Sequence, residues 1–162
     1  MSYGCIVCEI RPQKEEKERT RLTVGGDKLP YNGPTSTEIA DITTAKLVVN
    51  STISTPQARF VVFDIKNFYL GTPMKDYEYI RLHISILPDE IINKYRLQQI
   101  MDEGGWVYLE IRKGMYGLNQ AGRLANERLQ ANLKTYGYYP SQHTPGLWLH
   151  KTRPIQFCIS SR

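Results

Sequence analysis

Hydrophobic residues alternate with polar ones, or run continuously, at several places along the chain, and these patterns predict β-strands. The predicted strands cover GCIVCEI, Arg21–Val24, ARFVVFD, Tyr77–Ile86, WVYLEIR and the start of PIQFCIS. The run ARFVVFD lacks alternation, which is typical of a strand buried on both faces, and it ends at Asp64. The pattern therefore predicts a buried strand that delivers one carboxylate at its end.

Hydrophobic residues at helical spacing predict helices elsewhere. The predicted helices cover DITTAKLVVNSTIST, DEIINKYRLQQIM and LNQAGRLANERLQANLKTYG. Pro56 ends the first, Pro88 opens the second, and Gly137 marks the end of the third. Because strands and helices do not alternate regularly, the sequence predicts an α+β fold.

The composition is that of a globular chain, with 162 residues of which 41% are hydrophobic and 23% charged. No apolar run approaches the roughly 20 residues that cross a bilayer. The first residues become charged too soon for a signal peptide. The sequence therefore predicts an intracellular protein that makes no membrane contact.

The formal net charge of +5 permits contact with a polyanion without requiring it. Basic residues crowd into one short segment, at Arg11, Lys14, Lys17, Arg19 and Arg21. Glutamates are interleaved among them, so a solvated loop between two strands is the simpler interpretation.

Cys5 and Cys8 have the Cys-x-x-Cys spacing of a zinc knuckle. No second Cys or His pair stands at finger spacing, and the alternation of GCIVCEI favours a strand instead. A zinc-dependent structural module is therefore the least favoured of the function classes.

Asp64 is the residue whose position most needs an explanation. A carboxylate buried without a partner costs several kcal/mol or retains its proton. Asp64 either accepts hydrogen bonds from the backbone of the following turn, as a cap, or meets a cation. The residues around it leave both interpretations open.

Four segments occur in a recognisable order, namely RTRLTVGGD, VVFDIKNFYLGTPM, GMYGLNQAGRLANERL and GYYPSQHTPGLW. The second resembles the first catalytic motif of the reverse transcriptases of copia-type LTR retrotransposons. The third resembles the aromatic-Gly-Leu-x-Gln-Ala signature of that family and the helix after it. The resemblance covers residues 11–162, nearly the whole chain.

The resemblance implies a partial right-hand polymerase fold, with fingers and an incomplete palm built on an antiparallel sheet with packing helices. Residues 1–162 are then a single incomplete reverse transcriptase domain. Residues from 1 to about 55 are expected to be fingers-like. The remainder, residues 56–162, is expected to be palm-like with inserted fingers elements.

The resemblance also implies RNA-directed DNA polymerisation by two-metal nucleotidyl transfer. In the reaction that the resemblance implies, Asp64 is the catalytic residue and a ligand of Mg²⁺. The backbone carbonyl of Ile65 is expected to be a second ligand of this ion. Carboxylates are natural ligands of this hard cation, and two such ions activate the primer hydroxyl and hold the triphosphate.

The expected nucleotide-binding residues are Arg21, Lys66, Asn67, Tyr69 and Gln120. By resemblance, Arg21 clamps the phosphates, for which a guanidinium fork is suited. Tyr69 lies under the sugar and excludes a 2′-hydroxyl, Lys66 and Asn67 line the triphosphate side, and Gln120 opens a helix beneath the nucleotide. From the residues alone, each is equally an ordinary core or surface side chain.

One departure from the family is the lack of a later Asp-Asp pair, because no Asp or Glu follows Glu127. We therefore expect this chain to be a truncated, inactive member of the family. The expected partners are an RNA or DNA template-primer, a deoxynucleoside triphosphate and the rest of a retroelement polyprotein. The alternative is a non-catalytic nucleic-acid-binding remnant.

Overall fold

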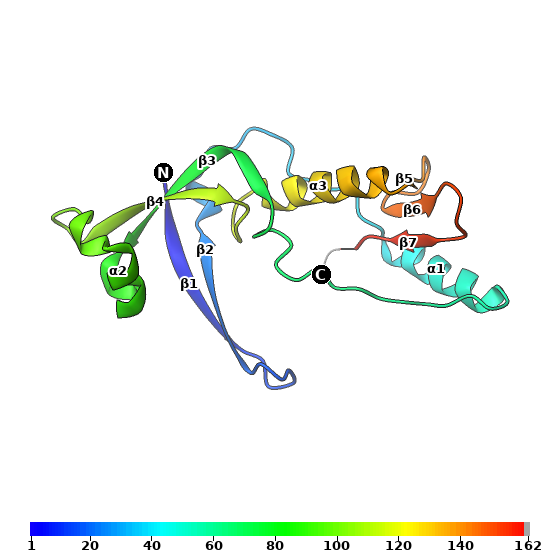
Figure 1. Ribbon diagram of the computed structural model, residues 1–162, viewed down its shortest axis with the longest axis horizontal. Coiled ribbons are helices and arrows are strands. Elements are labelled where there is room, and N and C mark those ends of the chain that lie inside the picture. The colour runs from blue at the N-terminus through cyan, green and yellow to red at the C-terminus, as the bar shows by residue number, and fades with distance from the viewer. Residues whose placement is uncertain (161–162) are drawn as a thin grey trace. The chain divides into compact units, whose positions relative to one another are not determined.

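A computed structural model describes residues 1–160 and shows a mixed α+β structure with three α-helices and two β-sheets among them (Figure 1). This confirms the predicted α+β class. The chain divides into two compact units. Unit 1 consists of Met1–Thr35 and Asn67–Ala125, and unit 2 consists of Ser36–Lys66 and the chain from Asn126 onward.

Unit 1 contains a four-stranded sheet in the order β2-β1-β3-β4. Its strands are β1 (Ser2–Ile10), β2 (Glu18–Val24), β3 (Pro73–His83) and β4 (Trp106–Lys113). The β1–β2 and β3–β4 pairs are antiparallel, whereas β1 and β3 pair in parallel through Ser2 with Ile80 and Tyr3 with Arg81. Of the basic residues expected in a solvated loop, Arg11, Lys14 and Lys17 lie in the connection of the β1–β2 hairpin, whereas Arg19 and Arg21 belong to β2.

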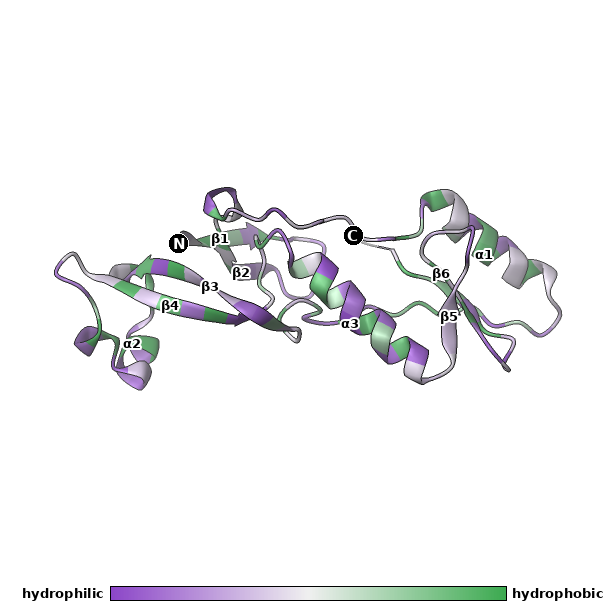
Figure 2. Cartoon of the chain, turned by 90° about the horizontal axis from the view of Figure 1, so that it is seen from above, coloured by the Kyte–Doolittle hydropathy of each residue, from purple (hydrophilic) through white to green (hydrophobic). Residues whose placement is uncertain are grey.

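The core of unit 1 lies on one face of β3 and β4. Leu82 and Val107 stand opposite each other in the ladder and are 1% and 0% exposed. Hydrophobic and hydrophilic residues alternate along both strands (Figure 2). Because successive side chains in a strand point to opposite faces, one face is buried and the other faces solvent.

The connection between β3 and β4 carries the short helix α2 (Asp89–Tyr95) and the 3₁₀ turns η2 (Ile84–Ile86) and η3 (Leu97–Gln99). Ile92 and Leu97 fill the core from this connection. The predicted helix after Pro88 is therefore correct in place but shorter than expected. It ends because Arg96 adopts a left-handed conformation, with φ of 51°.

Unit 2 contains α1 (Ile42–Ser54) and a three-stranded antiparallel sheet, β5-β6-β7. Its strands are β5 (Tyr138–Pro140), β6 (Leu147–His150) and β7 (Gln156–Cys158). The Asp41 carboxylate caps α1 by accepting a hydrogen bond from the Thr44 amide at 2.7 Å, which lowers the pKa of Asp41. The sequence predicted β7, whereas it did not predict β5 and β6.

Trp148 forms the centre of the unit 2 sheet and is 2% exposed. Its ring stacks on Phe157 of the neighbouring strand, with centroids 6.4 Å apart. Ala40, before α1, donates its amide hydrogen to the Ile159 carbonyl at 2.7 Å. This bond and the aromatic stack join the elements of unit 2.

The longest helix is α3 (Ala121–Thr135), and the boundary between the units falls within it, after Ala125. It confirms the prediction for the segment from Leu118 to Gly137. Gly137 follows the helix with a positive φ of 85°, a conformation that glycine adopts without strain.

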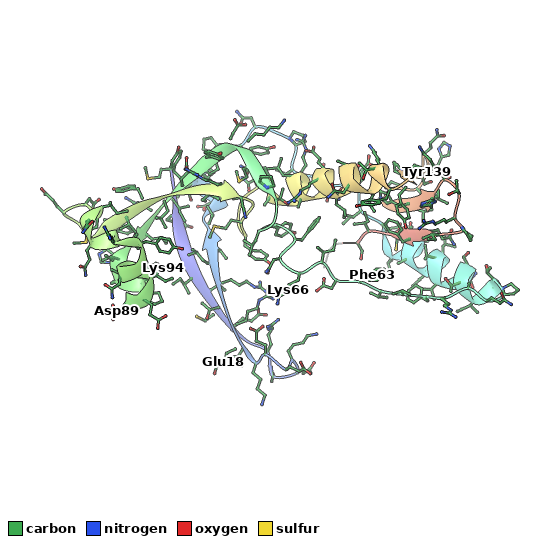
Figure 3. All side chains as sticks on the ribbon, in the orientation of Figure 1. Glu18, Phe63, Lys66, Asp89, Lys94 and Tyr139 are labelled. Atoms are coloured by element: carbon green, nitrogen blue, oxygen red, sulfur yellow. The ribbon has the colours of Figure 1, made fainter. Side chains whose placement is uncertain are left out.

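The predicted buried strand at ARFVVFD is wrong. Residues 58–65 form no strand, and they are exposed: Phe60 is 53% and Phe63 is 84% accessible. Figure 3 labels Phe63 on this extended segment. A strand requires a neighbouring backbone, and no main-chain hydrogen bond involves residues 59–66 within the described residues. Apolar residues alone therefore did not make a strand here.

The predicted strand at Tyr77–Ile86 is correct in its centre only. It begins earlier, at Pro73, and ends at His83, where the chain turns into η2. The His83 ring accepts a hydrogen bond from the Ser85 amide, which fixes this turn. A side-chain cap of this kind ends the strand although the apolar pattern continues.

Candidate functional site

The segment after β4 crosses two other backbones of unit 1. The Gly114 amide donates to the Thr72 carbonyl at 2.8 Å, and the Tyr116 carbonyl accepts from the Val24 amide at 2.8 Å. Gly117 has a φ of +92°, and a Cβ atom there would lie 1.9 Å from the Val24 carbonyl oxygen. Only glycine fits this crossing, which places Tyr116 between the end of β2 and the turn before β3.

Tyr116 contacts two of the residues predicted from the sequence. Its ring meets the Tyr69 ring edge-on, with centroids 5.4 Å apart and an interplanar angle of 80°. The guanidinium carbon of Arg21 lies 5.5 Å from the Tyr116 centroid, within cation–π range. The structure thus brings Arg21 and Tyr69 to one aromatic side chain.

The ion pair that Arg21 forms is weak. One of its terminal nitrogens lies 3.3 Å from Glu9 Oε2, and both side chains are partly exposed, at 34% and 47%. Such surface pairs contribute about 0–1 kcal/mol. The Arg21 Nε atom is buried without a hydrogen-bond partner. Because its ion pair with Glu9 is weak and its side chain is partly exposed, the guanidinium can also bind an anion such as phosphate.

Tyr69 is positioned by a tight turn between Asn67 and Thr72. The Thr72 amide donates to the Tyr69 carbonyl at 2.9 Å, and Asn67 adopts a left-handed φ of 55°. A Cβ atom added to Gly122 would lie 3.8 Å from the Tyr69 ring. The ring therefore lies near the first turn of α3, where it leaves room for a Cβ atom at position 122.

Gln120 directly precedes α3 and is only 6% exposed. Its side-chain Nε2 donates to Glu78 Oε1 at 3.1 Å, whereas its Oε1 has no partner. The Glu78 carboxylate, which only accepts, fixes this orientation of the amide. An unsatisfied buried acceptor costs about 1–3 kcal/mol, which a ligand hydroxyl or N–H would recover.

The remaining predicted residues are placed differently. Asp64, Ile65 and Lys66 belong to unit 2, and all three are exposed. Asn67, the first residue of the second segment of unit 1, is also exposed. Figure 3 labels Lys66 at the end of the extended segment. Within residues 1–160, the Asp64 carboxylate accepts no hydrogen bond and forms no ion pair. Since Asp64 is solvated, the expected conflict between its charge and burial does not arise.

The donor set does not fit a two-metal centre. No group of three or more His, Cys, Asp or Glu side chains among the described residues has an arrangement that would hold a metal ion. Asp64 alone supplies one carboxylate, where Mg²⁺ in such centres needs several oxygen ligands. Magnesium binding at Asp64 therefore stays a prediction.

Tyr116 is the functional candidate that sequence reasoning missed. It is the aromatic residue of the GMYGLNQA segment, so a signal was present. The segment does not reveal that this ring contacts Arg21 and Tyr69, because both contacts depend on how β2 and the turn before β3 are placed. Gln120, in contrast, is a residue that the resemblance of this segment predicts.

Two shallow hollows occur elsewhere, in unit 2. Apolar residues of α1, from Ile42 to Ile53, line a hollow of about 390 Å³, and a second of about 410 Å³ lies between α1 and the β5–β7 sheet. Their side chains bring no cluster of ionisable groups. These hollows therefore suggest no chemistry.

Comparison with protein-family models, with curated proteins and with solved structures gave no match. Among the described residues, no helix has the length and apolar character needed to cross a membrane.

Proposed function

We propose that the chain is a reverse-transcriptase-like domain of a copia-type retrotransposon polyprotein and that unit 1 binds a deoxynucleoside triphosphate. The observation that carries this proposal is the contact of Arg21 and Tyr69 with the Tyr116 ring, in the same unit as the buried amide of Gln120. Three predicted nucleotide-binding residues thus belong to one unit, although they are far apart in the sequence.

Each of these residues is suited to contact a different part of a nucleotide. The partly exposed guanidinium of Arg21 would donate to a phosphate oxygen. Gln120 Oε1 would accept a hydrogen bond from a hydroxyl or a base N–H, and the nearby Glu78 disfavours a phosphate at that end. The Tyr69 ring supplies an apolar surface for the sugar, the role that the resemblance implies.

The proposal includes the partial right-hand polymerase fold, with an RNA or DNA template-primer as the polymeric partner. The resemblance gives Asp64 and the Ile65 carbonyl, both in unit 2, as ligands of Mg²⁺, an ion that would neutralise charge on a triphosphate. Asp64 is the one carboxylate that the resemblance assigns to this ion. In this account unit 1 binds and orients the nucleotide.

The proposal is tested by equilibrium binding of a fluorescent deoxynucleoside triphosphate, with and without magnesium. Arg21→Ala should weaken binding about tenfold or more, since a charge-assisted hydrogen bond contributes about 1.5–3 kcal/mol. The matched control is Arg19→Ala, which removes an arginine two positions away on the same strand and should change affinity little. Equal effects of the two substitutions, or no binding by the wild type, would overturn the proposal.

A further inference from the structure

Residues 58–65 of unit 2 form an exposed segment that belongs to no helix or strand. Like Phe60 and Phe63, the apolar residues Val61, Val62 and Ile65 lie largely in water, at 61%, 69% and 51% exposure. Figure 3 labels Phe63 on this segment. A protein that stays monomeric seldom leaves so many adjacent large apolar side chains in water, so the segment is a candidate contact surface.

The backbone of this segment is unpaired as well. Among the described residues, no main-chain hydrogen bond involves residues 59–66. An exposed backbone with free N–H and C=O groups is a template for pairing with another strand. Residues 58–65 also contain no Pro or Gly, are rich in β-branched and aromatic residues, and carry one charge of each sign. This is the composition of segments that pair between chains.

The order of residues in RFVVFD (residues 59–64), which we call the RFVVFD segment, is complementary to itself in the antiparallel direction. When two copies are placed antiparallel, residues of matching chemistry stand opposite each other: Arg59 and Asp64, Phe60 and Phe63, and Val61 and Val62. Cross-strand pairs of opposite charges, of aromatic rings and of β-branched residues each stabilise a sheet. The segment therefore matches a second copy of itself along its whole length.

The two charges select this direction and register. A parallel pair in register would place Arg59 against Arg59 and Asp64 against Asp64, which is repulsive. An antiparallel pair shifted by one residue would place Asp64 opposite Ala58 or Phe60 and leave the charge without a partner. Within residues 1–160, neither Arg59 nor Asp64 forms an ion pair in its own chain. Both charges are thus available to a second copy.

We propose that the RFVVFD segment is a self-association site, at which a second copy of this chain binds as an antiparallel strand. Main-chain hydrogen bonds supply the affinity, and the paired side chains fix the register. The outer edge of each paired segment stays free, so the register does not limit the assembly to two copies. The inference does not rest on nucleotide binding, which is proposed for unit 1.

Sedimentation velocity of the full chain at increasing concentration tests the inference. The weight-average mass of the wild type should rise with concentration. Arg59→Asp and Asp64→Arg should each weaken self-association about tenfold or more, because two attractive cross-strand pairs become repulsive. A mixture of these two variants should associate again, because every pair between the two kinds of chain then joins a carboxylate to a guanidinium.

Three further variants serve as controls. Lys66→Asp makes the same change of charge as Arg59→Asp but lies outside the RFVVFD segment, so it should change self-association little. Phe63→Lys should weaken self-association strongly, whereas Ile53→Lys should not, although Ile53 is a similarly exposed apolar residue of α1. Arg21→Ala should associate like the wild type even if it loses nucleotide binding. The two proposals therefore fail separately.

Hydrogen exchange provides an independent readout of strand pairing. The amides of residues 59–66 should exchange freely in the dilute chain and become protected as the concentration rises, but not in Arg59→Asp. A monomeric mass of the wild type at every concentration, or no association in the mixture of charge variants, would overturn the inference. Loss of association in Ile53→Lys but not in Phe63→Lys would also overturn it, because the contact would then involve the apolar face of α1.

Discussion

The Tyr69 ring meets the Tyr116 ring edge-on, with centroids 5.4 Å apart. This contact joins the turn before β3 to the segment after β4, and Arg21, from the middle of β2, lies over the Tyr116 ring. Three parts of unit 1 thus meet at one ring. Because Tyr116 holds Tyr69 and Arg21 in place, it is a positioning residue for the proposed nucleotide site.

Substitution of Tyr116 tests this role directly. Tyr116→Ala removes an edge-to-face pair and a cation–π contact, so we expect the free energy of unfolding to fall by about 1–3 kcal/mol. Tyr116→Phe should change it little, because no hydrogen bond to the Tyr116 hydroxyl occurs among the described residues. Urea unfolding followed by circular dichroism measures the free energy of unfolding of both variants. Equal decreases in the two variants would contradict the claim that the contacts of the Tyr116 ring stabilise unit 1.

Gly117 should be irreplaceable at the crossing with β2. Gly117→Ala is expected to lower the free energy of unfolding by about 3 kcal/mol or more, because a positive φ costs about 1–3 kcal/mol and the new Cβ atom would meet backbone. The clash is with the Val24 carbonyl oxygen, at 1.9 Å. Gly122→Ala is the matched control, since its Cβ atom would meet only the Tyr69 ring at 3.8 Å. Comparable unfolding midpoints for the two variants would show that the crossing is not as tight as described.

The ionisation of Tyr79 should respond to Glu110. The negative charge of Glu110 and the hydrogen bond to it raise the pKa of Tyr79 above its ordinary value of about 10. A raised pKa means that the stabilisation is present below about pH 10 and is lost as the pH rises through the folded-state pKa. Glu110→Gln should move the Tyr79 pKa back toward its ordinary value, as measured by ultraviolet titration with Tyr79→Phe as reference. An unchanged titration curve would exclude this contact.

The segment that carries Asp64 should exchange its amide hydrogens rapidly. Residues 59–66 make no main-chain hydrogen bond within the described residues, whereas β3 and β4 form a regular ladder. Hydrogen-exchange mass spectrometry should therefore find little protection in residues 59–66 and strong protection in β4. Strong protection in residues 59–66 would instead restore the strand that the sequence predicted.

The parts of the fold that were predicted correctly depend on local signals. Asp41 caps α1 through its own side chain, and the alternation along β3 matches its buried and exposed faces. The strand expected at ARFVVFD failed because its formation depends on a neighbouring backbone that no local pattern supplies. The candidate site shows the same dependence on distant parts of the chain. Gln120 could be predicted from its own segment, but the contacts of Tyr116 join residues that are far apart in the sequence.

The most direct test of the central claim is the NMR signal of the Gln120 side-chain amide, in isotope-labelled protein titrated with a deoxynucleoside triphosphate and magnesium. If unit 1 binds the nucleotide, this signal and the ring signals of Tyr69 and Tyr116 should shift together and saturate. The ring of Tyr136, which is 76% exposed and outside unit 1, should not shift. Unchanged Gln120, Tyr69 and Tyr116 signals at millimolar nucleotide would contradict the claim.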